Sequence, residues 1–221
     1  MSETLRRIQF VTTYYDWLQG LRFVPLGLMG LGLAVWLAVS GEEKPRLREH
    51  PVEVALAVGL AVGLYAVLGA YYRRRFGVVR ASASTRKRMV WGIGLAAALG
   101  LLTGGGAAVA QKLSGSTHLP VLVGLLLLGL TIVVGWYWSG RVAHHYLPVA
   151  GVVVVLGLLD ALGASPVCAL LERLPFATAS RCAVVTLTGV TGATLIMVGL
   201  LDHRLLVRML GGAPEPEEAS E

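Results

Sequence analysis

Six long stretches of apolar residues, separated by polar segments, dominate the pattern along this chain. A membrane-spanning helix needs about 20 predominantly apolar residues to cross about 30 Å of hydrocarbon, and each stretch matches or approaches that length. The pattern therefore predicts an all-α integral membrane protein, in which residues 23–210 form a bundle of six transmembrane helices. The predicted spans are residues 23–39, 52–72, 89–110, 119–138, 147–171 and 183–201.

The two ends of the chain lie outside these spans. Residues 1–22 carry apolar side chains at helical spacing: Ile8, Val11, Tyr15 and Leu18. This spacing places them on one face, so we expect a cytoplasmic amphipathic helix that lies in the membrane interface. Residues 211–221, GGAPEPEEASE, have little to bury. They are predicted to form a disordered acidic cytoplasmic tail.

Composition excludes an ordinary soluble globular domain. Apolar residues make up 55% of the chain and charged residues 14%, and the mean hydropathy is +0.69. A soluble domain carries about 25% charged residues. The short polar segments between most of the apolar stretches favour helices that are antiparallel to their neighbours in sequence.

Positive charge is concentrated between the second and third apolar stretches. Seven of the 19 lysine and arginine residues lie within residues 73–88. Loops rich in lysine and arginine stay on the cytoplasmic side of a membrane. We therefore expect a multi-pass protein of the plasma or inner membrane, with both termini in the cytoplasm. The residues of this basic loop are Arg73, Arg74, Arg75, Arg80, Arg86, Lys87 and Arg88.

The basic loop suits anionic lipid headgroups or a protein partner at the cytoplasmic face. Near an anionic surface, each basic residue contributes about 1 kcal/mol. Nucleic acid is not an expected partner, because Tyr71, Tyr72 and Phe76 belong to a helix end rather than to an exposed stacking platform. A second copy of the chain is a further candidate partner.

The two cysteines, Cys168 and Cys182, fall at the ends of the last two spans, opposite the basic loop. That side is oxidising in bacteria. We predict a disulfide that closes a loop of about 15 residues and contributes about 3 kcal/mol in the chain-entropy model. The alternative is two free cysteines buried as small apolar side chains.

Asp160 is the most unusual residue of the apolar stretches, because it lies about midway along residues 147–171. A carboxylate at that depth costs roughly 2.5–3.5 kcal/mol on insertion scales. It is therefore a candidate for handling a substrate or a proton. Thr188 and Thr191 are candidate polar partners on the last span.

Two structural alternatives for Asp160 stay open. The helix ends or bends near Gly163, before Pro166, which would leave Asp160 near the outer headgroups. Alternatively, Asp160 is protonated and hydrogen-bonded to a neighbouring helix, since burial raises the pKa of a carboxyl group.

Many of the 28 glycines lie within the spans. Glycine lets helix backbones approach closely in lipid, so we expect a tightly packed bundle or an oligomer interface. A bend at Gly104–Gly106 is the alternative for the third span. The small-xxx-small pairs are Gly59/Gly63 and Gly100/Gly104, and Gly27, Gly30 and Gly32 crowd the first span.

Enzyme and cofactor signatures are weak. His144, His145 and His203 fall at the predicted membrane border, where Asp202 reads as part of a polar helix end. We assign no catalytic residue, no metal and no cofactor. The sequence favours a non-enzymatic membrane component, acting in assembly, as a scaffold or as a regulatory partner through the basic loop. The alternative is a small-solute or proton-coupled transporter centred on Asp160.

Overall fold

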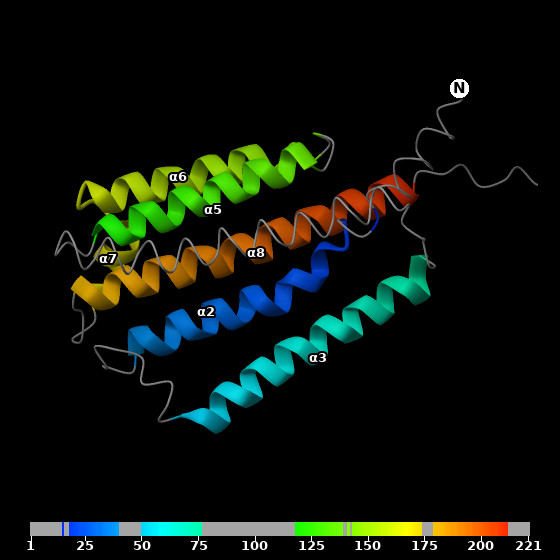
Figure 1. Ribbon diagram of the computed structural model, residues 1–221, viewed down its shortest axis with the longest axis horizontal. Helices are drawn as coiled ribbons and strands as arrows, with labels where there is room; N and C mark the ends of the chain where they lie inside the picture. Colours follow the sequence, from blue (N-terminus) through cyan, green and yellow to red (C-terminus); the bar gives the residue numbers. More distant parts are fainter. Residues whose placement is uncertain are drawn as a thin grey trace, which may run out of the picture.

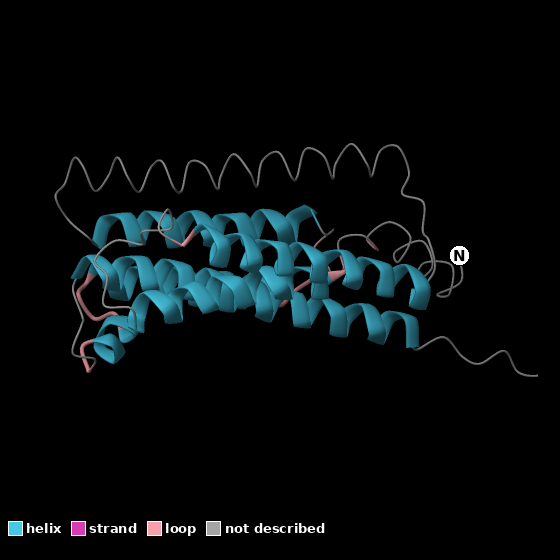
Figure 2. Cartoon of the chain, turned by 90° about the horizontal axis from the view of Figure 1, so that it is seen from below, coloured by secondary structure: helices cyan, strands magenta, loops and turns pink. Residues whose placement is uncertain are grey.

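A computed structural model describes residue 15 and residues 18–39, 50–76, 118–138, 141, 143–173 and 179–211. Within these residues the regular structure is helical, and no strand occurs among them (Figure 2). The long helices run side by side along one direction (Figure 1). The elements are the 3₁₀ helix η1 (Gly20–Phe23) and the α-helices α2 (Val24–Val39), α3 (Pro51–Phe76), α5 (His118–Trp138), α6 (Tyr146–Ala161), α7 (Pro166–Leu171) and α8 (Ala179–Gly211).

Four helical stretches are long and apolar enough to cross a membrane. They are Gly20–Val39, Pro51–Arg75, His118–Tyr137 and Cys182–Met209, and α6 is apolar but shorter. The predicted all-helical fold of membrane type is confirmed at this level. The predicted third span, residues 89–110, lies outside the described residues, so the number of six spans stays a prediction.

α8 lies between α2 on one side and the α5–α6 pair on the other (Figure 1). Its contact with α2 and η1 depends on glycines from both sides. A Cβ at Gly192 would lie 2.7 Å from the carbonyl oxygen of Gly27 and 2.7 Å from the amide nitrogen of Leu31. The backbones therefore touch, as glycine permits in helix packing within lipid.

The other glycines singled out in the sequence have different surroundings. Gly30 also faces Gly192, because a Cβ added at Gly30 would lie 3.2 Å from the Cα of Gly192. Gly32, Gly59 and Gly63 have open space within 4 Å of that position. The small-xxx-small pair on α3 therefore packs on nothing among the described residues. Gly100 and Gly104–Gly106 lie outside the described part of the chain.

The structure divides the predicted span over residues 147–171 into two helices, α6 and α7. Gly163 follows α6 with φ +73°, a left-handed conformation that glycine adopts without a Cβ penalty. Ser165 then caps α7 by accepting a hydrogen bond from the amide of Cys168, and Pro166 occupies the first turn. Proline has no N–H and clashes with the preceding turn, so α6 cannot continue through it. The helix therefore breaks near Gly163, which is one of the two structural alternatives that the sequence leaves open.

The described part of the N-terminal segment is buried in protein. Tyr15 and Leu18 pack in a cluster with Tyr72 of α3 and Leu206 of α8. At these two positions the predicted apolar face therefore packs against other helices. Residues 1–14 lie outside the described residues, as do residues 212–221 of the predicted tail.

Candidate functional site

Asp160 does not lie midway across the bundle. It occupies the last turn of α6, beside His118, the first residue of α5. The Nδ1 atom of His118 lies 3.3 Å from Oδ2 of Asp160, and the two side chains are 47% and 1% exposed. Because α6 ends at Ala161, Asp160 lies at one end of the bundle and not halfway along a helix over residues 147–171.

The partners of Asp160 also differ from those expected. Among the described residues, the carboxylate of Asp160 contacts His118 and Cys168. The expected partners were Thr188 and Thr191. The hydroxyl of Thr188 instead donates to the carbonyl oxygen of Val184 in its own helix, at 2.7 Å. His118 had no signal in the sequence beyond its place at the start of an apolar stretch.

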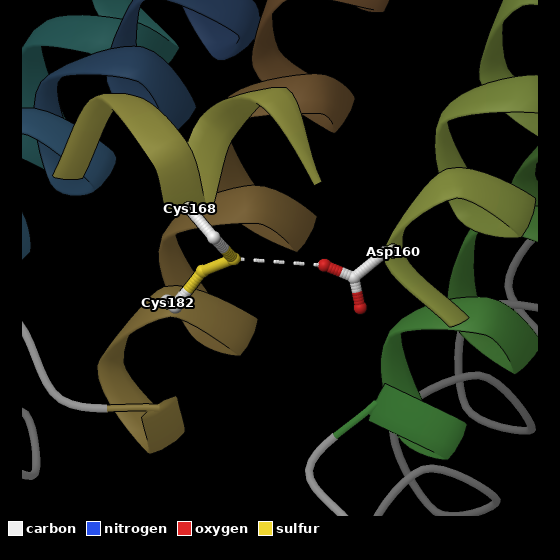
Figure 3. A group of neighbouring side chains, drawn as sticks. All are labelled: Asp160, Cys168 and Cys182. Atoms are coloured by element: carbon white, nitrogen blue, oxygen red, sulfur yellow. Dashed lines mark hydrogen bonds between the residues drawn. A yellow bond between two sulfur atoms is a disulfide. The ribbon is translucent and has the colours of Figure 1, made fainter. Parts of the chain in front are cut away.

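Cys168 of α7 and Cys182 of α8 form the predicted disulfide, with their Cα atoms 5.4 Å apart. The Sγ atom of Cys168 also lies 3.7 Å from Oδ1 of Asp160 (Figure 3). We call His118, Asp160, Cys168 and Cys182 the disulfide-end cluster. The α6–α7 turn brings the carboxylate and the disulfide together, and no pattern in the sequence indicates this contact.

Three groups of the disulfide-end cluster lie close enough together to be considered as metal ligands. One carboxylate oxygen of Asp160 and the two cysteine sulfurs lie within 4.8 Å of one another. A metal would need cysteine thiolates, whereas the sulfurs here are bonded to each other. In its disulfide form the cluster therefore does not offer a metal-binding set.

Replacing both cysteines with serine should lower the free energy of unfolding by about 3 kcal/mol, because the disulfide removes loop entropy from the unfolded chain. The bonded residues are 14 apart in sequence. Denaturant unfolding of the oxidised protein and of the double serine variant in the same detergent would measure the difference. Equal unfolding midpoints would contradict a stabilising role.

A second group of buried polar side chains lies at the opposite end of the bundle. Asp202 of α8 is 1% exposed, and its Oδ1 lies 2.9 Å from Nε2 of His145. The hydroxyl of Tyr146 donates to its Oδ2 at 2.7 Å. The prediction that Asp202 belongs to a polar helix end facing headgroups was therefore wrong, because α6 covers it.

The polar contacts continue to the other side of α8. Nδ1 of His203 lies 2.9 Å from the hydroxyl oxygen of Tyr72. The backbone amide of Leu21 donates a hydrogen bond to the same oxygen at 3.3 Å. Tyr15 donates to the carbonyl oxygen of Tyr72 at 2.9 Å. We call Tyr15, Tyr72, His145, Tyr146, Asp202 and His203 the tyrosine–aspartate network. A buried carboxylate is tolerated when it is paired and hydrogen-bonded, so the network fixes this end of α8 to α3, α6 and the segment before η1.

Exposed arginines surround the tyrosine–aspartate network at the same end of the bundle. Arg73, Arg74 and Arg75 complete the last turn of α3, and Arg204 and Arg208 are exposed near the end of α8. Arg141, in the turn between α5 and α6, stacks over Trp136 and Tyr137. We call this set of arginines the arginine end. Arg80, Arg86, Lys87 and Arg88 of the predicted basic loop lie outside the described residues.

Charges at the disulfide end are mixed where the structure describes them. Exposed Glu53, Glu172 and Arg173 lie there, with His50 beside Glu53. The two ends therefore differ in charge, and α3 carries this difference within one helix.

The fold and the two clusters define a class: an all-helical protein of membrane type, with a disulfide at one end and arginines at the other. No family model matches the chain, and neither the curated proteins nor the solved structures contain a match.

Proposed function

We propose that this protein is a multi-pass integral membrane component whose arginine end faces the cytoplasm and docks a partner, and that this docking role is non-enzymatic. Its role would be assembly, scaffolding or regulation. The observation that carries the proposal is the set of exposed arginines from α3, α8 and the α5–α6 turn at one end of the bundle. Basic residues of this kind stay on the cytoplasmic side.

Two features support a docking surface that is held firmly. Tyr72 is fully buried directly before exposed Arg73, and its hydroxyl and carbonyl oxygens both take part in the tyrosine–aspartate network. Arg208 lies two residues after buried Leu206. The arginines therefore extend from helix ends whose positions are fixed by packing, which reduces the entropy lost when a partner binds.

Anionic lipid headgroups or an acidic protein surface would complement this charge. The apolar faces of the helices suit a lipid environment, because large side chains such as Leu56, Leu60 and Val67 of α3 are exposed. A second copy of the chain could pack where Gly59 and Gly63 of α3 have open space. We place the lipid or protein partner at the arginine end and keep the second copy as the weaker proposal.

A small-solute or proton-coupled transporter centred on Asp160 is a weaker proposal than docking at the arginine end. Such a site is expected near the bilayer midplane, whereas Asp160 lies in the last turn of α6. Its contacts with His118 and Cys168 favour a local role at the disulfide end.

Replacing Arg73, Arg74 and Arg75 with serine should weaken recovery of an anionic lipid or acidic protein at least tenfold. Each basic residue near an anionic surface contributes about 1 kcal/mol, so three would contribute about 3 kcal/mol. The measurement is purification in mild detergent, with co-purified lipids and proteins quantified by mass spectrometry.

The matched control removes three basic residues from the segment between the first two spans, Lys44, Arg46 and Arg48. This triple serine variant should retain the same lipids and proteins as the unaltered protein. Equal losses in both variants, or no loss in either, would contradict docking at the basic loop.

A further inference from the structure

The disulfide of this protein lies against a buried carboxyl group, and a half-exposed imidazole lies behind that group. Oδ1 of Asp160 is 3.7 Å from Sγ of Cys168, and Oδ2 is 3.3 Å from Nδ1 of His118. Asp160 is buried, whereas 47% of the His118 side chain is exposed. The three groups form a continuous line from solvent to sulfur, and the sulfur end of that line is visible in Figure 3.

A purely structural disulfide has no use for this carboxylate. A disulfide sulfur carries no proton, so it cannot donate a hydrogen bond to Oδ1 of Asp160. Burying a carboxylate is costly unless its oxygens are hydrogen-bonded or paired. The group that complements Oδ1 is a cysteine thiol, which is the reduced form of Cys168. Asp160 therefore has a complementary partner in the reduced form of the cysteine pair.

We propose that Cys168–Cys182 is a redox-active disulfide that exchanges with dithiols at this end of the protein. Asp160 exchanges a proton with Cys168, and His118 passes that proton between Asp160 and water. The substrate class is a dithiol, either on a protein or on a small molecule. This chemistry is independent of docking at the arginine end, because the two clusters occupy opposite ends of the bundle.

The accessibility of the two sulfurs sets the order of the exchange. Cys182 is buried, at 7% exposure, whereas Cys168 is partly exposed. The first thiolate of the dithiol therefore attacks Sγ of Cys168. A substrate–Cys168 disulfide forms, the Cys168–Cys182 bond breaks, and its electron pair leaves on Sγ of Cys182. The hydroxyl oxygen of buried Thr186 lies 4.0 Å from that sulfur, close enough to stabilise the departing thiolate.

The second thiolate of the substrate then attacks its own sulfur in the mixed disulfide. The substrate is released as a disulfide, and the bonding electron pair leaves on Sγ of Cys168. Asp160, in its acid form, gives this thiolate a proton and is reprotonated from water through His118. Cys182 takes up the second proton. The dithiol has lost two electrons and two protons, and the cysteine pair has gained both. In the reverse direction Asp160 accepts the proton of Cys168 and so generates the attacking thiolate.

The test follows the reduction of the full-length protein by dithiothreitol in mild detergent, with free thiols counted by maleimide labelling at several pH values. General acid–base groups typically contribute at least about 100-fold to a rate, so Asp160→Asn should slow reduction at least about tenfold. The slowing should vary with pH, because the lost group exchanges protons. The control is Glu172→Gln, which removes an exposed carboxylate one residue after α7 and should leave the rate unchanged.

His118→Gln provides a second variant at a half-exposed position, and it decides the question where Asp160→Asn fails to fold. It should retain the disulfide and alter the pH profile of the reduction rate. The proposal is overturned if dithiothreitol opens the disulfide only when the protein unfolds. It is equally overturned if the folded Asp160→Asn protein, or the His118→Gln protein where that variant decides, shows the rate and pH profile of the unaltered protein.

Discussion

Gly192→Leu should lower the free energy of unfolding by about 3 kcal/mol or more and separate α8 from α2. A Cβ at position 192 already lies within 2.7 Å of backbone atoms of Gly27 and Leu31. Backbone atoms cannot move aside as a flexible side chain can. Overpacking of a well-packed interior typically costs 1–3 kcal/mol and sometimes more, and leucine adds four carbons at this contact.

The measurement is thermal or denaturant unfolding in detergent, combined with size-exclusion chromatography. Gly59→Leu is the matched control, because its Cβ position on α3 has open space within 4 Å. Gly59→Leu should be at least as stable as the unaltered protein, because helix propensity favours leucine over glycine by up to about 1 kcal/mol. Comparable stability of the two variants would contradict the close α2–α8 contact.

Asp202→Ala should cost about 3–5 kcal/mol of stability. The carboxylate of Asp202 accepts a hydrogen bond from the hydroxyl of Tyr146 and pairs with His145. It is almost completely buried. Removing one member of a buried pair leaves the other group desolvated and unpaired, which typically costs this amount. The arginine end should loosen as well, because Arg204 and Arg208 follow on the same helix.

Unfolding of Asp202→Ala is compared with that of Arg204→Ala, which changes an exposed residue two positions further on. The Arg204 variant should stay within about 0.5 kcal/mol of the unaltered protein. A double variant with Tyr146→Phe should be less destabilised than the sum of the single changes, because the two side chains share one hydrogen bond. A cost below about 1 kcal/mol for Asp202→Ala would contradict the role of the tyrosine–aspartate network.

The apolar character and the length of the stretches were sufficient to predict the helices over residues 23–39, 52–72 and 119–138, to within a few residues. These elements depend on local composition, which a single sequence displays directly. The disulfide was predictable for the same reason, since both cysteines fall at the ends of neighbouring apolar stretches. The division of residues 147–171 was visible only as an alternative, because Gly163 and Pro166 can end a helix or merely bend it.

The burial of Asp202 could not be predicted from its neighbourhood. The local sequence LLDHR is typical of a helix leaving the membrane, and its burial depends on His145 and Tyr146, more than 50 residues away. The same holds for Asp160, whose surroundings come from the start of α5 and from α7. Polar residues from distant segments create both clusters, and a sequence pattern does not record which segments meet.

We propose that opposite ends of the bundle face opposite sides of a membrane, with the arginine end in the cytoplasm. α3 tests this within one helix, because exposed Glu53 lies in its first turn and exposed Arg75 in its last. Single variants Glu53→Cys and Arg75→Cys are labelled with a membrane-impermeant maleimide in intact cells and in inside-out vesicles. The native cysteines do not react while their disulfide is intact.

We expect labelling of Glu53→Cys in intact cells and of Arg75→Cys in inside-out vesicles. Labelling of both variants from the same side would contradict a membrane-spanning α3, and the reversed pattern would place the arginine end outside the cytoplasm.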